Sequence, residues 1–296
     1  MPNTPKRILL QLDCDPQPST FDAIVAVDAG ADVLLRHGGV TSDNVVPLVH
    51  GGMFTRGGAD LAATAIFIGG SDVARAEAVA DRVQKTFFGP VRLGVLVDPA
   101  GANTTAAAAV VAAGRHLDLA GRPCSAVVLG GTGPVGQRVA RLLAGKGVTV
   151  SLASRSRERA EQTVQRILHA LPGARVSPIE SPAAIRPGSP LERLVAEADL
   201  IVAAGAAGAT LLDDAGRGLA AAATVLIDLN AVPPAGIAGI VATDKGRVEG
   251  RAFLYGALGV GGTKMKIHRA AIGRIFESPA TCLDAEDLLA IGEALR

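Results

Sequence analysis

The stretch Val127–Ala160 reads VVLGGTGPVGQRVARLLAGKGVTVSLASRSRERA and has the layout of a strand, a tight turn, a helix and a second strand. An apolar run ends at Leu129, glycines follow, and apolar residues then recur at helical spacing before a second apolar run begins. A strand–turn–helix unit of this kind belongs to a parallel sheet covered by helices. The stretch therefore predicts an α/β fold.

The glycines of this turn fit the pattern G-x-G-x-x-G, which between a strand and a helix indicates a dinucleotide site. We assign Gly131 to the tight turn, Gly133 to close approach of a pyrophosphate, and Gly136 to close packing of helix on sheet. The helix N-terminus would stabilise the anion, and a proline suits its first turn. The alternative is a βαβ turn without a ligand. The residues expected to bind the cofactor here are Gly131, Thr132, Gly133, Pro134, Val135 and Gly136.

The tip of the second strand reads Ser154-Arg155-Ser156-Arg157, where an NAD site usually carries an acidic residue. Such an acid accepts a hydrogen bond from the ribose 2′-hydroxyl and repels a 2′-phosphate. Ser154 is neutral, and the Arg155 guanidinium is suited to a phosphate. The tip therefore favours NADP over NAD. The alternative is that the arginines only begin a solvated helix.

The composition agrees with a helix-covered sheet and gives no sign of a polyanionic partner. Of 296 residues 49% are hydrophobic and only 3% aromatic, which suits packing by Ala, Val, Leu and Ile. Lys and Arg total 29 against 28 Asp and Glu, so no overall field attracts nucleic acid or an anionic membrane. The three cysteines lack C-x-x-C spacing and we expect reduced thiols. With no recognisable signal peptide, we expect a soluble cytoplasmic protein.

Strand and helix patterns alternate along the whole chain. They predict two open parallel α/β domains: residues 1–121 for substrate, and a Rossmann-type NADP-binding domain at 122–261. The C-terminal helical segment 262–296 is expected to pack back on the first domain. Expected strands are 8–12, 33–35, 63–70, 91–97, 125–129, 148–153, 175–179, 199–203 and 224–228. Expected helices begin near 19 and cover 72–86, 103–116, 262–276 and 284–295, with loops or a short helix at 178–190.

Candidate site residues lie where strands end. The polar residues 98–105 follow an expected strand at the carboxyl edge, where open α/β sheets bind ligands. Three further residues near strand ends, Ala204, Gly205 and Asn230, are expected to contact the cofactor. Lys264 follows what we expect to be a glycine loop and is the candidate cation for the cleft. The five histidines show no H-x-x-x-H pairing, so no metal site is expected.

Segments spread over the chain resemble the NADP-dependent methylene-tetrahydromethanopterin/methylene-tetrahydrofolate dehydrogenases of methylotrophic bacteria. These segments are LLQLDCDPQPSTFDAIVAVDAGAD, FTRGG, TAIFIGG, FFGP, NTTAAAA, GGTGPVG, NAVPPAGIAGI, ATDKG, GALGVGGTKMKIHRA and FES. The resemblance implies a two-domain subunit with a pterin site between the domains and a homo-oligomer, a trimer or hexamer. It also implies catalytic roles for Lys264, Asp22, Thr104 and Thr105.

The implied reaction is oxidation of a methylene bridge between two nitrogens to the methenyl form, within one-carbon metabolism. The product is a resonance-stabilised cation, and hydride passes directly to nicotinamide, so no general base is required. Two alternatives stay open. One is a shikimate-dehydrogenase-like NADP oxidoreductase, which ASRSRERA and DLNAVPP also resemble, although its catalytic segments have no counterpart in residues 1–120. The other is a non-catalytic protein that senses NADP.

Overall fold

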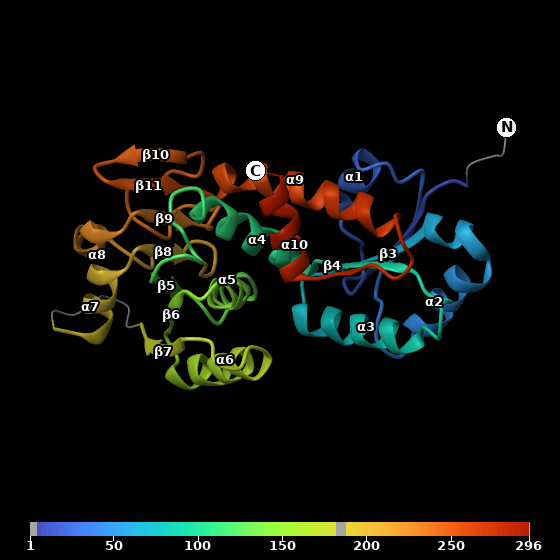
Figure 1. Ribbon diagram of the computed structural model, residues 1–296, viewed down its shortest axis with the longest axis horizontal. Coiled ribbons are helices and arrows are strands. Elements are labelled where there is room, and N and C mark those ends of the chain that lie inside the picture. The colour runs from blue at the N-terminus through green and yellow to red at the C-terminus, as the bar shows by residue number, and fades with distance from the viewer. Residues whose placement is uncertain (1–4, 182–187, 296) are drawn as a thin grey trace. The chain divides into compact units, whose positions relative to one another are not determined.

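The computed structural model describes residues 5–181 and 188–295, and the chain forms two compact units, each with one sheet (Figure 1). The first unit contains the residues up to Thr104 and those from Met265, and the second contains Thr105–Lys264. Both boundaries lie inside helices, α4 (Ala102–Ala113) and α9 (Ala257–Ile275). We expected the boundaries at 121/122 and 261/262, between elements.

The first unit has a five-stranded sheet in the order β12-β4-β3-β1-β2, with all strand pairs parallel. Its strands are β1 Ile8–Asp13, β2 Val33–His37, β3 Thr64–Gly69, β4 Gly94–Val97 and β12 Cys282–Leu283. Its helices are α1 Thr20–Asp28, α2 Val45–Phe54, α3 Val73–Thr86 and α10 Ala285–Ala294, with 3-10 turns η1 Gly58–Ala63 and η2 Pro99–Gly101. The C-terminal segment thus adds a strand, β12, to this sheet as well as the expected helices.

The core of the first unit lies on the central strands. Every residue of β3 is buried, and β1 is buried from Leu9 onward. Continuous burial is what a parallel strand shows when helices cover both faces. Capping side chains set the helix starts: Ser19 Oγ accepts from Asp22 N, and Asp72 accepts from Arg75 N.

The second unit has a seven-stranded sheet in the order β10-β11-β9-β8-β5-β6-β7. Its strands are β5 Ser125–Leu129, β6 Thr149–Ser154, β7 Val176–Glu180, β8 Leu200–Ala203, β9 Val225–Asp228, β10 Lys245–Glu249 and β11 Ala252–Tyr255. Its helices are α5 Pro134–Gly145, α6 Arg157–Ala170, α7 Pro190–Glu197 and α8 Asp214–Leu219, with 3-10 turn η3 Ala220–Ala222. β10 and β11 form an antiparallel hairpin, so this sheet is mixed at one edge.

One sequence expectation in the second unit needs correction. The segment 178–190 is not wholly loop, because Pro178 lies in β7 and Pro190 begins α7 with Ser189 as its cap. Residues 182–187 of that segment lie outside the described residues. Within the described ranges, no helix has the length and hydropathy needed to cross a bilayer.

Candidate functional site

The glycine turn joins β5 to α5 and packs backbone directly on backbone. Gly130 has a φ of +71°, and a Cβ there would lie 2.7 Å from the backbone N and Cα of Gly205. At Gly136 a Cβ would lie 2.6 Å from the Gly130 carbonyl oxygen. Since real Cβ atoms do not approach so closely, both positions require glycine. The expected role of Gly136 in close helix packing is confirmed.

The tight turn involves Gly130 as well as Gly131, since Gly133 N donates to Gly130 O at 3.1 Å across it. Gly130 carries the left-handed backbone conformation, which side chains other than glycine rarely adopt. Gly131 instead lies over Leu152, whose Cγ would be 2.6 Å from an added Cβ, and its N–H donates to Ala153 O at 2.9 Å. Gly131 therefore ties the turn to β6.

Gly133 is the residue before α5, and the protein's own packing does not require glycine there. An added Cβ would be 3.5 Å from the nearest atoms, an ordinary contact. The helix behind it starts with Pro134 and has no acidic residue in its first turn. The first N–H groups of a helix have no intrahelical acceptor and favour an anion. These features fit the pyrophosphate of a dinucleotide.

The two arginines at the tip of β6 differ in their side-chain contacts. Ser154 is buried, and its hydroxyl lies 3.3 Å from that of Thr132, which joins the tip to the glycine turn. Arg157 pairs with Glu161 one helical turn later (Nε–Oε1 2.8 Å). Arg155 is exposed and forms no ion pair within the described part of the chain. Arg155 is therefore the arginine that remains available to an anionic group.

The end of β8 lies next to the glycine turn, because β8 is the neighbour of β5 in the sheet. Ala204 N donates to Leu129 O at 2.9 Å, so the chain leaves β8 beside the end of β5. A Cβ at Gly205 would lie 2.7 Å from Leu211 Cδ1. The expected cofactor residues Ala204 and Gly205 are thus brought against the turn that starts at Gly130.

Asp228, which our sequence reasoning missed, organises the loop after β9. Its buried carboxylate accepts N–H bonds from Asn230 (3.0 Å), Gly236 (2.7 Å) and Ile237 (3.2 Å). Burial raises the pKa of Asp228, and these three donors partly offset that rise. Asn230 closes the loop, since its amide donates to Pro234 O and its carbonyl accepts from Val232 N. Its expected contact with the cofactor stays a prediction.

In the first unit, Asp13 plays the same part after β1. Its buried carboxylate accepts from the N–H groups of Asp15 (2.9 Å) and Ser19 (3.0 Å). Ser19 caps α1, and Asp22 lies in the first turn of that helix. The position of Asp22 is therefore fixed from the carboxyl end of β1, in the helix that was expected to begin near residue 19.

Asp98, directly after β4, organises the next segment in the same way, and it holds Thr104 by hydrogen bonds. Its Oδ1 accepts from Asn103 N (2.9 Å) and Thr104 N (3.1 Å), and its Oδ2 accepts from Thr104 Oγ1 at 2.6 Å. Residues 103–105 therefore lie in the first turn of α4, in agreement with the helix expected from residue 103. The preceding Ala100 has a φ of +53°, a strained conformation for a residue with a Cβ.

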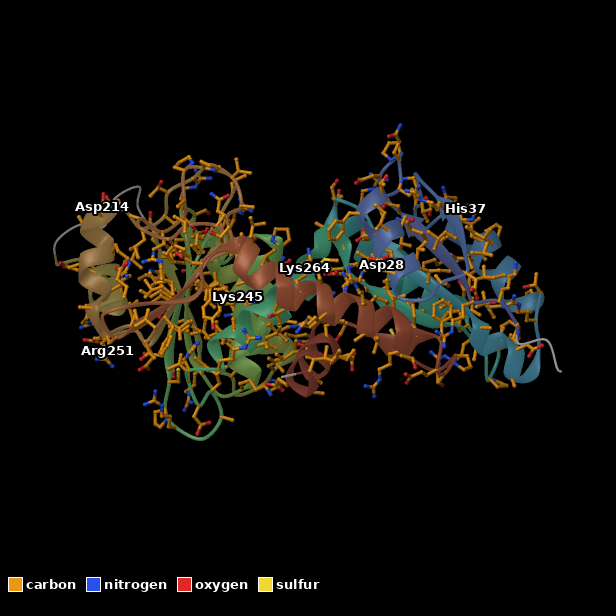
Figure 2. All side chains as sticks on the ribbon, turned by 90° about the horizontal axis from the view of Figure 1, so that it is seen from above. Asp28, His37, Asp214, Lys245, Arg251 and Lys264 are labelled. Atoms are coloured by element: carbon orange, nitrogen blue, oxygen red, sulfur yellow. The ribbon has the colours of Figure 1, made fainter. Side chains whose placement is uncertain are left out.

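Lys264 lies on α9, not after a glycine loop as we expected (Figure 2). The helix begins at Ala257 and includes Gly259, Gly261 and Gly262, because the preceding turn packs against its first residues. Lys264 is half-buried, whereas Lys266 is exposed. The neighbouring Thr263 accepts a hydrogen bond from Arg115 Nη2 at 3.2 Å.

The four expected catalytic residues are divided between the units. Asp22 and Thr104 belong to the first unit, and Thr105 and Lys264 belong to the second. Their catalytic roles stay predictions. In residues 5–181 and 188–295, no three His, Cys, Asp or Glu side chains gather as they would around a metal ion.

His116 is packed against the sheet of the second unit. Its ring stacks on Phe253 (centroids 3.7 Å apart), and its Nε2 lies 2.8 Å from the Tyr255 hydroxyl. Burial, and then the nearby Arg115 charge, lower the pKa of His116 from its ordinary value of 6.5. The folded protein therefore favours the neutral ring.

The lowered pKa of His116 should appear in the pH dependence of the free energy of unfolding. Because the folded pKa lies below the unfolded one, the contribution of His116 to stability is complete above pH 6.5 and decreases as the pH falls from there toward the folded pKa. In urea unfolding at pH 7.5 and 5.5, His116→Gln should lose less stability on acidification than the unsubstituted protein. His169→Gln, on the exposed face of α6, is the control. An unchanged pH dependence in His116→Gln would contradict the assignment.

The strand order of the second unit, its glycine turn and its helix N-terminus define a Rossmann-type dehydrogenase fold. Two solved structures share the two-unit plan over nearly their whole length. Quinate dehydrogenase from Corynebacterium glutamicum in complex with NAD has a TM-score of 0.52 at 15% identity, covering 97% of this chain and 98% of that one. Shikimate 5-dehydrogenase from Listeria monocytogenes, with shikimate and NAD, has a TM-score of 0.53 at 13% identity, covering 92% and 96%.

Two relatives from Methylorubrum extorquens are much more similar in sequence. The bifunctional protein MdtA is 40% identical over 98% of this chain and 99% of its own. An NAD(P)-dependent methylenetetrahydromethanopterin dehydrogenase is 34% identical over 91% and 92%. The family model described as methylene-tetrahydromethanopterin dehydrogenase, N-terminal, matches residues 20–100. The chain belongs to the methylene-tetrahydromethanopterin dehydrogenase family, as its sequence segments predicted.

Proposed function

We propose that this protein oxidises the methylene bridge of methylene-tetrahydromethanopterin to the methenyl form with NADP. The observation that carries the proposal is the 34% identity, over 91% of this chain, to a relative named as an NAD(P)-dependent methylenetetrahydromethanopterin dehydrogenase. The likeness to quinate and shikimate dehydrogenases concerns the fold alone, at 15% and 13% identity. It gives the shikimate-type alternative no further support.

The second unit carries the residues suited to the cofactor. The N-terminus of α5 would hold the pyrophosphate, while Gly130 and Gly136 keep the turn close to the helix. Ser154 and Arg155 at the tip of β6 would bind the 2′-phosphate. Bound NADP supplies the hydride acceptor. Ala204, Gly205 and Asn230, which follow strand ends at the same edge of this sheet, would also contact the cofactor.

The substrate side requires alignment and charge control rather than proton transfer. A methylene carbon between two nitrogens becomes a delocalised cation as it is oxidised, so the protein has no proton to remove there. Asp22 would offset the developing positive charge, and Lys264 would bind a carbonyl oxygen of the pterin. The Thr104 hydroxyl donates a hydrogen bond to Asp98. The role of Thr104 would therefore be to hold the first turn of α4, which presents Thr105.

A direct assay decides between the functions. The purified protein should reduce NADP with methylene-tetrahydromethanopterin, measured by NADPH absorbance. Methylene-tetrahydrofolate tests the second carrier, and shikimate and quinate test the alternative dehydrogenase. Tight NADP binding without turnover of any donor would instead support the NADP-sensing alternative and refute the proposal.

We further propose that the enzyme acts in the cytoplasm as a homo-oligomer, and that it also accepts the folate carrier.

The cofactor preference rests on Arg155. Arg155→Ala should weaken NADP binding by roughly tenfold to a hundredfold while sparing NAD, because one charge-assisted contact contributes about 1.5–3 kcal/mol. Titration calorimetry with both cofactors measures this. Arg157→Ala is the matched control, since Arg157 is already paired with Glu161 and should leave both affinities nearly unchanged. Equal losses of NADP and NAD affinity in Arg155→Ala would refute the assignment.

A further inference from the structure

The first turn of α9 packs on the chain segment 239–245 at two glycines. A Cβ at Gly256 would lie 2.1 Å from Val241 O, and one at Gly259 would lie 1.8 Å from Asp244 O. No side chain can be accommodated at such distances without moving the backbone. The start of α9 is therefore seated directly on the backbone of segment 239–245.

Backbone hydrogen bonds join the same two pieces. The N–H groups of Leu258 and Gly259 donate to Ala242 O at 2.8 and 3.1 Å, and Gly256 N donates to Asp244 O at 2.8 Å. The first N–H groups of a helix need acceptors from outside the helix. Segment 239–245 supplies them, so its course determines where α9 begins.

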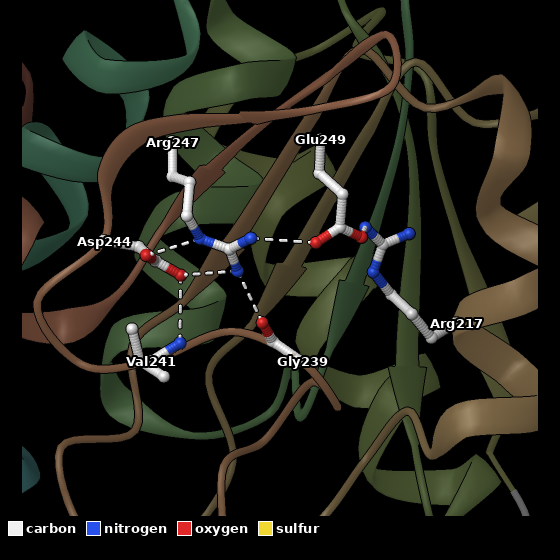
Figure 3. A network of polar contacts seen from close by, with 6 residues as sticks. All are labelled: Arg217, Gly239, Val241, Asp244, Arg247 and Glu249. Carbon is white, nitrogen blue, oxygen red and sulfur yellow. Dashed lines mark hydrogen bonds and ion pairs between the residues drawn. The ribbon is translucent and has the colours of Figure 1, made fainter.

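Arg247 holds segment 239–245 in this course (Figure 3). It binds Asp244 through two bonds, Nε–Oδ1 at 2.7 Å and Nη2–Oδ2 at 3.0 Å, and its Nη2 also donates to Gly239 O at 2.6 Å. Asp244 Oδ2 in turn accepts from Val241 N at 3.0 Å. One guanidinium thus connects both ends of the segment on which α9 is seated.

The pair formed by Arg247 and Asp244 differs electrostatically from the outer arm of the network, which runs through Glu249. Burial alone would raise the pKa of Asp244, but hydrogen bonds from Arg247 and Val241 outweigh it, and the pKa of Asp244 lies below its ordinary value. The outer arm is Arg247–Glu249–Arg217, with Nη1–Oε2 at 2.8 Å and Nη2–Oε1 at 3.0 Å. Glu249 is exposed, and pairs that involve an exposed carboxylate contribute little to stability.

We propose that Arg247 is a positioning residue for Lys264, acting through segment 239–245 and the first turn of α9. Lys264 lies five residues beyond Gly259 on an uninterrupted helix, a rise of about 7.5 Å. A displacement of the helix start is therefore carried to the lysine. This inference rests on the proposed function, in which Lys264 binds the pterin.

Amide hydrogen exchange tests the first step without any substrate. Arg247→Gln should speed exchange at Leu258 and Gly259, whereas Arg217→Gln, which removes only the outer arm, should not. Exchange in α5 should be unchanged in both variants, which shows that the second unit stays folded. Unchanged exchange at Leu258 and Gly259 in Arg247→Gln overturns the proposal.

A double-substitution cycle tests the link to Lys264. Arg247→Gln should lower turnover of the methylene carrier about tenfold, the effect of a small misplacement, with NADP affinity unchanged. In the Lys264→Ala background it should lower turnover no further, because the positioned group is gone. Independent, additive losses overturn the link. An unsubstituted protein that shows no turnover refutes the proposed function and this link with it, while the exchange result still decides how α9 is held.

Discussion

Lys264→Ala is expected to lower turnover of the methylene carrier by about two orders of magnitude or more, the scale of losing one well-placed electrostatic contact. The side chain is half-buried on α9 rather than fully solvated, so it has a defined position from which to hold an oxygen of the pterin. NADP affinity should hardly change, because the residues proposed to bind the cofactor phosphates lie around α5 and β6. Steady-state kinetics and NADP titration on one preparation give both quantities.

Lys266→Ala is the matched control for this result. Lys266 lies two residues further along the same helix and is exposed, so its removal changes the net charge equally but should leave turnover near normal. Near-normal turnover in a folded Lys264→Ala variant would mean that Lys264 takes no part in the reaction. Equal losses in both variants would point to helix charge rather than to a specific contact.

Gly130→Ala is expected to lower the free energy of unfolding by about 2–5 kcal/mol and to abolish measurable NADP binding. About 1–2 kcal/mol comes from a side chain at φ +71°. About 1–3 kcal/mol more comes from forcing a Cβ into the backbone of Gly205, 2.7 Å away. Relief of that contact must move the ends of β5 and β8 apart, which displaces the turn proposed to hold the pyrophosphate. Urea unfolding and cofactor titration measure the two effects.

Gly147→Ala separates backbone strain from collision. Gly147 follows α5 and also has a positive φ, +87°, but an added Cβ would meet no atom within 4 Å. Its substitution should lower the free energy of unfolding by only about 1–2 kcal/mol and leave NADP binding intact. If the two variants lost equal stability and both still bound NADP, close backbone approach at Gly130 would not matter to the site.

The parts of this fold that could be predicted from sequence are those set by local patterns. Apolar runs located β5 with its observed bounds and β1 to within one residue, because buried parallel strands are nearly continuous apolar runs. The helix expected to begin near residue 19 starts at Thr20, and the helix expected over 72–86 covers Val73–Thr86 with Asp72 as its cap. The glycine pattern gave the turn between β5 and α5.

The remaining features depend on partners that are distant in sequence. Nothing local distinguishes Gly130 from Gly131, since the positive φ follows from packing on Gly205. The glycine-rich start of α9 looks like a loop by intrinsic propensity, and its contacts with segment 239–245, which supply acceptors for its first N–H groups, are not visible in the local sequence. Asp98 is different, since its donors lie only five and six residues further on, but its strand-end position alone did not reveal the hydrogen bonds that it accepts from them.

Three buried aspartates, Asp13, Asp98 and Asp228, end strands β1 and β9 or directly follow β4, and each accepts N–H groups from the segment beyond. These segments therefore owe their shape to a strand-end carboxylate and to main-chain donors, which every residue type except proline provides. If a ligand binds beside them, such segments need little further ordering, so its binding would sacrifice little conformational entropy. Ligand-facing side chains can then be exchanged during evolution while the framework around them keeps its course.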